Sequence, residues 1–269
     1  MIIDTHVHCF ADKIAEKAGQ QLIKTAGIPA YTDFTERDTR KKLDVWGIHL
    51  GIVLPIATKP SQQKIVNDWA ASLQHNNLLA FGSVHPESGD ALNELERIKE
   101  LGLLGVKLHP DYQGFFADEP RLYPIYQKIS DLSLPVAFHV GFDPLSPDLI
   151  HATPKMISKI SRLFPDLTII AAHMGGMRLG EECLNELAGA PNVYLDLALI
   201  EDIRPQSEVN AIIEKHGSDK ILFATDCPWC LPSVILERLD KVGLTDEQKE
   251  DILWRNAAKL FNISTPRSY

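Results

Sequence analysis

The sequence predicts a closed (β/α)₈ barrel, the TIM-barrel form of the α/β class. Eight short apolar runs alternate with longer amphipathic stretches, which is the pattern of repeated strand–helix units. The runs are rich in Ile, Val, Leu and Phe with little polar alternation, as is typical of parallel strands covered on both faces. The length of 269 residues suits one barrel. A doubly wound open sheet is the structural alternative.

The apolar runs give the predicted strands in order. We expect strands at Met1–His8, Leu50–Ala57, Leu78–His85, Leu103–His109, Pro135–Gly141, Leu167–His173, Val193–Leu199 and Ile221–Asp226. Between them, apolar residues recur at helical spacing. The predicted helices are Gln62–Gln74, Ala91–Leu101, Tyr123–Leu132, Lys155–Phe164, Glu181–Leu187 and Glu208–His216. A capping box of Thr245 and Gln248 begins a closing helix that ends near Phe261.

The segment between the first two strands is nearly twice as long as the other connections. Two short helices fit there, Asp12–Thr25 and Thr35–Trp46. In a barrel such an insertion lies over the carboxyl ends of the strands, where it can contribute to a lid. Because the chain shows no internal repeat or linker, we expect residues 1–269 to form a single barrel domain with an insertion at about 10–47.

Composition limits the classes of binding partner and the cell compartment that we expect for this protein. The net charge of −9 argues against nucleic acid and anionic membranes as partners. The four cysteines are scattered, unlike a disulfide framework, which suits a reducing cytoplasm. The start of the chain lacks the features of a signal peptide, and no apolar run approaches the roughly 20 residues that span a bilayer. We therefore expect a soluble, cytoplasmic protein that acts on a small molecule.

Five of the predicted strands carry, near their carboxyl ends, residues that suit a metal site. His6 and His8 occupy alternate positions of the first strand and therefore share one face. The fourth strand carries a lysine in an apolar context, where a charge costs several kcal/mol unless it is paired or modified. The later residues of this kind are Lys107, His139, His173 and Asp226. Because active sites of this fold lie at the carboxyl ends of the strands, these side chains predict a metal site there.

Further polar residues at the same end are candidates for substrate contacts. His109 shares the strand face of Lys107 and lies at the strand tip. Arg178 follows the turn after the sixth strand, where a cation can hold a substrate carboxylate. Three more candidates lie on loops of this face: Tyr112, Gln113 and Trp229.

Six motifs together resemble the amidohydrolase superfamily, specifically its amidohydrolase-2 branch, which includes the aminocarboxymuconate-semialdehyde-decarboxylase-like proteins. They are DTHVH, GVKLHP, FHVG, AHMGG, TDCPW and the terminal WRNAAKLF, and they span essentially the whole chain. The resemblance implies a metal-dependent enzyme on a barrel fold that uses one or two divalent ions, zinc in our expectation.

The resemblance implies two metal arrangements. In the binuclear one, the first ion is held by His6, His8 and Asp226, and the second by His139 and His173, with Lys107 carboxylated on Nζ as the bridge. In the mononuclear one, a single ion is held by His6, His8, His139 and Asp226, and His173 is free for acid–base work. Since Lys107 would be an unneeded buried cation beside one ion, we favour two.

The leading functional hypothesis is hydrolysis. Metal-bound hydroxide would attack the carbonyl of a lactone, ester or amide in a small substrate that bears a carboxylate. Asp226 would take the proton of the attacking water, while the second ion or His173 stabilises the oxyanion. One alternative is a mononuclear, non-oxidative decarboxylase or hydratase of an aromatic-derived acid. Another is a non-catalytic binding protein on the same barrel. The sequence leaves a homodimer as a possible oligomeric state, because an apolar surface patch cannot be identified from a single sequence.

Overall fold

Eight parallel strands form a closed ring in the computed structural model, which describes residues 1–200 and 204–264. The strands are β1 (Ile3–Val7), β2 (Leu50–Val53), β3 (Leu78–Ala80), β4 (Val106–Leu108), β5 (Val136–Phe138), β6 (Ile169–Ala171), β7 (Val193–Asp196) and β8 (Ile221–Leu222). Neighbouring strands pair within two sheets, β1 to β3 and β4 to β8, and every pair is parallel.

Two seams join the sheets into a barrel. At one seam Gly82, just after β3, forms a parallel bridge with Val106 of β4. A Cβ atom on Gly82 would lie 2.6 Å from the Ile98 side chain, so this close approach requires glycine. At the other seam Val7 of β1 bridges Cys227, just after β8. The predicted (β/α)₈ barrel is thereby confirmed, and the open-sheet alternative is wrong.

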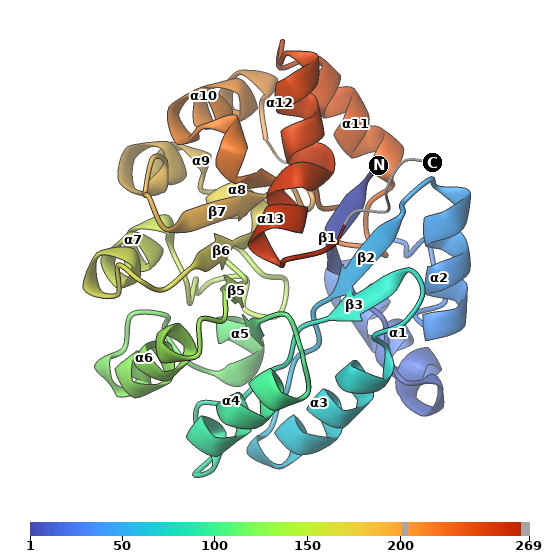
Figure 1. Cartoon of the computed structure of the whole chain (residues 1–269), viewed down its shortest axis with the longest axis vertical. Helices are drawn as coiled ribbons and strands as arrows, with labels where there is room; N and C mark the ends of the chain where they lie inside the picture. Colours follow the sequence, from blue (N-terminus) through green and yellow to red (C-terminus); the bar gives the residue numbers. More distant parts are fainter. Residues whose placement is uncertain (201–203, 265–269) are drawn as a thin grey trace.

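Helices surround the ring of strands (Figure 1). They are α1 (Asp12–Ala26), α2 (Glu36–Val45), α3 (Gln63–Ser72), α4 (Ala91–Glu100), α5 (Pro110–Gln113), α6 (Tyr123–Asp131), α7 (Pro154–Leu163), α8 (Ala172–Gly175), α9 (Gly180–Glu182), α10 (Gln206–His216), α11 (Pro232–Asp240), α12 (Asp246–Glu250) and α13 (Asn256–Leu260). Sequence reasoning missed α11, although Pro232 at its first turn and the buried Ile235 and Leu239 signal a helix. Within the described ranges, no helix is both long and apolar enough to cross a bilayer.

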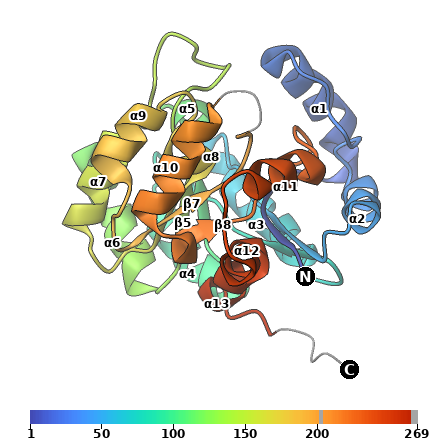
Figure 2. The ribbon, with the colours of Figure 1, turned by 90° about the horizontal axis from the view of Figure 1, so that it is seen from above.

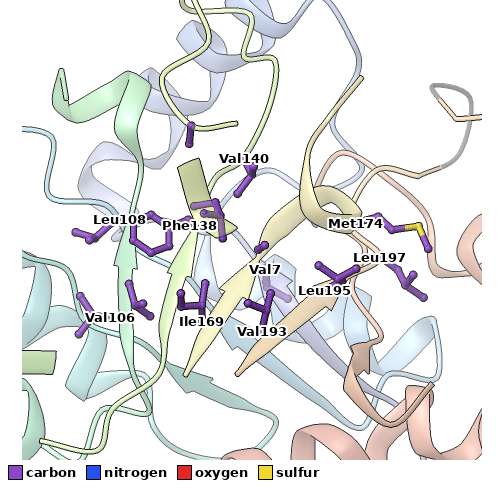
Figure 3. Close-up of a cluster of buried hydrophobic side chains, with 14 of the residues drawn as sticks. Val7, Val106, Leu108, Phe138, Val140, Ile169, Met174, Val193, Leu195 and Leu197 are labelled. Atoms are coloured by element: carbon purple, nitrogen blue, oxygen red, sulfur yellow. The ribbon is translucent and has the colours of Figure 1, made fainter. Parts of the chain in front are cut away.

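Alternate residues of the strands pack outward against these helices. The outward set in β4 to β7 includes Val106, Leu108, Phe138, Ile169, Val193 and Leu195, all buried in one apolar cluster (Figure 3). Because side chains alternate across a strand, the residues between them face the barrel interior. Lys107 of β4 is one of these inward residues, and Ala137 and Ile170 are others.

The interior is apolar at the amino ends of the strands. Ile3, Phe81, Ile170 and Leu222 belong to a second buried cluster, which also contains Phe261 at the end of α13. The rings of Phe81 and Phe261 meet edge to face at 5.6 Å between centroids. This packing closes the amino end of the barrel and leaves the carboxyl end for polar side chains.

The insertion after β1 contains the two predicted helices, and α1 stands beside the barrel (Figure 2). The insertion packs on the barrel through the buried Phe34, whose ring lies 6.0 Å from that of Phe10 and 5.5 Å from that of Trp229. The backbone N–H of Tyr31 donates to the carbonyl of Pro228 at 2.9 Å. The insertion therefore packs on the loop after β8, at the carboxyl end of the barrel.

Candidate metal centre

Three side chains from β1 and the loop after β8 converge at the carboxyl end of the barrel. Nε2 of His6 lies 3.1 Å from Nε2 of His8 and 3.3 Å from Oδ1 of Asp226, and Nε2 of His8 lies 3.1 Å from the same oxygen. Two ligands that are each about 2.1 Å from one ion lie roughly 3.0–3.4 Å apart at octahedral or tetrahedral angles. These residues, here called the metal-ligand group, therefore fit a single divalent cation.

Asp226 reaches this group from an unusual backbone conformation. It has a φ of 62°, in the left-handed region that non-glycine residues rarely adopt. Burial by itself raises the pKa of Asp226, yet the imidazoles of His6 and His8 bring that pKa below its ordinary value. Asp226 therefore supplies an anionic oxygen to the metal-ligand group near neutral pH.

Asp196, at the end of β7, orients the first histidine of the group. Nδ1 of His6 donates to Oδ2 of Asp196 at 2.8 Å, so Nε2 keeps its lone pair for an ion. The other oxygen of Asp196 accepts from the backbone N–H of His173 at 2.8 Å. Sequence reasoning missed Asp196, although an aspartate inside the apolar run Val193–Leu199 is the available signal.

His139 and His173 face each other beside the metal-ligand group. Nδ1 of His173 lies 3.2 Å from the carbonyl oxygen of Ala198, and Nε2 of His139 lies 3.2 Å from that of Phe142. Since a carbonyl only accepts, each of these nitrogens carries its ring's hydrogen. In the neutral rings, Nε2 of His173 and Nδ1 of His139 are then both unprotonated, and they lie 3.0 Å apart. This histidine pair therefore calls for a proton or a cation between its lone pairs.

Lys107 of β4 lies in the barrel interior near Asp196 and Asp226. Its side chain is fully buried, and within the described part of the chain Nζ has no hydrogen-bond partner. Burial lowers the pKa of Lys107 to about 8, although the charges of Asp196 and Asp226 oppose this shift. In turn, the charge of Lys107 adds to burial in lowering the pKa values of His6 and His139. The lysine thus faces the interior of the site, as its strand position predicts.

His109, His139 and Asp143 form a second group of possible ligands. The two imidazoles stack at 4.3 Å between centroids, and Oδ2 of Asp143 lies 3.6 Å from Nε2 of His109 and 3.7 Å from that of His139. Because Nε2 of His139 already donates to the Phe142 carbonyl, this group fits an ion less well than the metal-ligand group does. Asp143 was not expected, though its place just after β5 matches that of other site residues.

The other candidate substrate contacts occupy different surroundings. Tyr112 is partly buried, and its ring meets that of His109 edge to face at 4.6 Å. Trp229 is also partly buried, against Phe34. Arg178 is exposed, with its guanidinium carbon 3.7 Å from the centre of the Phe142 ring. Tyr112 belongs to the short helix α5, whereas Arg178 and Trp229 lie on loops.

Gln113 differs from the other candidates. Its side-chain nitrogen donates to the carbonyl oxygens of Ala57 at 2.9 Å and Val84 at 2.8 Å. Its side-chain oxygen accepts from the backbone N–H of His109 at 2.9 Å. The buried amide is therefore occupied by the backbone of three strand ends, which places Gln113 as a support for the site instead of a substrate contact.

Three known proteins show what this chain is similar to. The gamma-resorcylate decarboxylase of Polaromonas sp. (strain JS666) is 24% identical over 226 residues, which cover 65% of this chain and 67% of that protein. The 2-amino-3-carboxymuconate-6-semialdehyde decarboxylase of Dictyostelium discoideum is 24% identical over 243 residues, with 76% and 67% covered. A dihydroxybenzoic acid decarboxylase from Polaromonas sp. JS666, solved with manganese and 2-nitroresorcinol, superposes with a TM-score of 0.71 at 18% identity over 98% of both chains.

These relatives correct the leading functional hypothesis. The sequence was expected to encode a hydrolase of lactones, esters or amides, but both curated relatives and the solved structure named above are decarboxylases. The hypothesis leaned on Lys107 as a bridge between two ions, and a lysine on β4 does not by itself specify the reaction. The decarboxylase alternative accounts for the comparisons better.

The family comparison covers nearly the whole chain. The model of the Amidohydrolase family matches residues 3–263, from β1 to beyond α13. That range contains every strand of the barrel and all residues of the metal-ligand group. The chain therefore belongs to the amidohydrolase family, as its motifs suggested.

Proposed function

We propose that the protein is a metal-dependent, non-oxidative decarboxylase of a small aromatic or aromatic-derived carboxylic acid. The observation that carries the proposal is the metal-ligand group with the histidine pair beside it, at distances of 3.0–3.3 Å between ligand atoms. The decarboxylase relatives support the reaction class. In this reaction the ring carbon that bears the carboxylate gains a proton, the carbon–carbon bond breaks, and carbon dioxide leaves.

Three protein ligands fit a catalytic ion, because such sites leave positions open for substrate. We assign these ligands to His6, His8 and Asp226, and we place His139 outside the set because its ring nitrogens face His173 and the Phe142 carbonyl. When bound, a divalent cation such as zinc or manganese supplies a Lewis acid that orients the substrate oxygens and draws charge from them.

The histidine pair can supply the proton that the reaction consumes. One proton held between Nε2 of His173 and Nδ1 of His139 would remove the repulsion between their lone pairs. Burial lowers the pKa values of both histidines, so a proton held there is readily given up. In this scheme His173 is the general acid. A second ion at the same pair is the competing occupant, in which case carboxylated Lys107 is its expected bridge.

Residues around the opening would hold the substrate. Tyr112, His109 and Trp229 offer aromatic faces and polar tips, and Arg178 offers a cation. We further propose that residues 1–269 form one domain whose insertion at about 10–47 borders this opening.

The test is release of carbon dioxide from defined acids. Protein purified without chelators and supplied with zinc or manganese is incubated with 2,6-dihydroxybenzoate and other hydroxybenzoates, and the phenol product is followed by chromatography. We expect equimolar carbon dioxide and phenol. Both products should be lost in His8→Ala but not in the control His49→Ala, whose histidine directly precedes β2. An absence of product from every acid with the metal-ligand group loaded would reject the proposal.

Metal content distinguishes one ion from two. Plasma mass spectrometry on protein prepared with bicarbonate should give one equivalent that Lys107→Ala leaves unchanged. Two equivalents that fall to one in Lys107→Ala would instead place an ion at the histidine pair and remove His173 from acid–base work.

A further inference from the structure

Lys107 is a buried ammonium group whose partner the described protein does not contain. Its side chain is 0% exposed, and Nζ makes no hydrogen bond within residues 1–200 and 204–264. No ion pair within 4.0 Å joins it to any carboxylate in that part of the chain. A buried charge of this kind is costly unless a counter-ion meets it.

The carboxylates around Lys107 are already engaged elsewhere. Asp196 uses one oxygen for His6 and the other for the backbone N–H groups of His173 and Ala198. Asp226 directs Oδ1 to the two histidines of the metal-ligand group. Asp143 accepts from the backbone N–H of Leu145 at 2.7 Å through one oxygen and faces His109 with the other. These groups attract the lysine at a distance but leave its donors free.

We propose that the Lys107 ammonium binds the carboxylate of the substrate and thereby selects acids over their neutral analogues. This proposal rests on the proposed function, because it takes the ligand to be a carboxylic acid that binds beside the metal-ligand group. Lys107 would then hold the acid group and orient the ring toward His173.

The test uses ligands that do not react. Benzoate has no ring hydroxyl to support protonation of the ring, and benzamide has the same shape without the charge. We would measure the affinity of both for the metal-loaded protein by calorimetry or ligand-observed NMR. Wild type should prefer benzoate on the order of 10- to 100-fold, as expected for a charge-assisted hydrogen bond.

Lys107→Met should abolish that preference by weakening benzoate while leaving benzamide unchanged. The methionine fills similar space without a charge, and it leaves no hydrogen-bond partner of Lys107 Nζ stranded, since the described residues contain none. Lys159→Met removes the same charge from the outer helix α7, where Lys159 is 46% exposed and paired with Asp118, and should keep the preference. Metal content and thermal unfolding of each variant exclude an indirect effect.

Two results would overturn the proposal. One is a Lys107→Met variant that still prefers benzoate; the other is a carbamate on Lys107, detected by NMR after exchange with ¹³C-bicarbonate, since a carbamate is anionic. If no acid is decarboxylated but Lys107→Met still loses the benzoate preference, the proposed reaction fails while the carboxylate site stands.

Discussion

His6 and Asp196 are 190 residues apart in the chain, yet Nδ1 of the histidine lies 2.8 Å from Oδ2 of the aspartate. The contact links β1 to β7 and fixes which imidazole nitrogen of His6 is left to bind an ion. A carboxylate at this position only accepts, so it keeps the hydrogen on Nδ1 and the lone pair on Nε2.

Asp196→Asn should weaken metal binding by about 10- to 100-fold, as is usual when such an outer partner is lost. The asparagine N–H would donate to Nδ1 of His6 and move the ring hydrogen to Nε2. Competition with a chromophoric chelator measures the affinity. Asp240→Asn, on the exposed end of α11, is the matched control. Equal affinities in the two variants would mean that Asp196 does not set the histidine tautomer.

A divalent ion should stabilise the fold through the metal-ligand group. An ion that binds only the native state adds about 3–4 kcal/mol at 100 to 1,000 times its dissociation constant. Calorimetric unfolding with and without zinc or manganese should show a higher midpoint with the ion. The shift should vanish in His8→Ala and persist in His49→Ala. A shift of the same size in His8→Ala would contradict the assigned ligands.

His216 should make stability depend on pH away from the site. Burial lowers the pKa of His216 to about 4 from 6.5, although the hydrogen bond that Nε2 donates to the carbonyl of Val193 opposes this shift. The unfolded chain then binds more protons between these values, so stability is intact above about pH 6.5 and falls as the pH drops toward 4. At pH 5 His216 alone should account for a loss of about 2 kcal/mol, in addition to the losses from the buried histidines of the site.

Urea unfolding of the chelated protein at pH 7 and pH 5 measures this loss. His216→Gln keeps one donor and one acceptor but does not titrate, so it should lose about 2 kcal/mol less than wild type on acidification. His75→Gln, at a half-exposed side chain, should behave like wild type. A His216→Gln variant with the wild-type pH response would show that other groups cause it.

Gly19→Ala should destabilise the protein even though alanine favours helices by about 1 kcal/mol over glycine. A Cβ atom at this position of α1 would lie 2.3 Å from the ring of Phe34, which anchors the insertion. Thermal unfolding and limited proteolysis of α1 are the measurements. A Gly27→Ala control meets no atom within 4 Å but has a φ of 71°, so it reports backbone strain alone. A more stable Gly19→Ala protein would show that Phe34 yields readily.

The barrel could be predicted from the sequence because buried parallel strands carry a strong local signal. The predicted run Pro135–Gly141 is apolar apart from His139, and β5 (Val136–Phe138) lies within it. Strand alternation also placed Lys107 and His6 on the interior face. By contrast, α11 has a short apolar stripe between loops, and this weaker signal was missed.

The site was predicted in part, because its contacts depend on the closed ring. Strand ends indicate which residues gather, but side-chain rotation decides the partners of each nitrogen. The two ring nitrogens of His139 thus contact His173 and the Phe142 carbonyl. Asp196 and Asp143 were missed because one carboxylate near a strand end is common and gains meaning only from its neighbours. The reaction could not be read from the ligands, since related metal sites support several chemistries.

The metal-ligand group straddles the seam between the first and last strands. His6 and His8 come from the first eight residues, whereas Asp226 follows β8, next to Cys227, which bridges Val7. A nascent or truncated chain without β8 lacks one of the three ligands. Tight metal binding should therefore begin only when β1 and the loop after β8 have come together in the folded barrel. A bound ion would then link the first strand to the last.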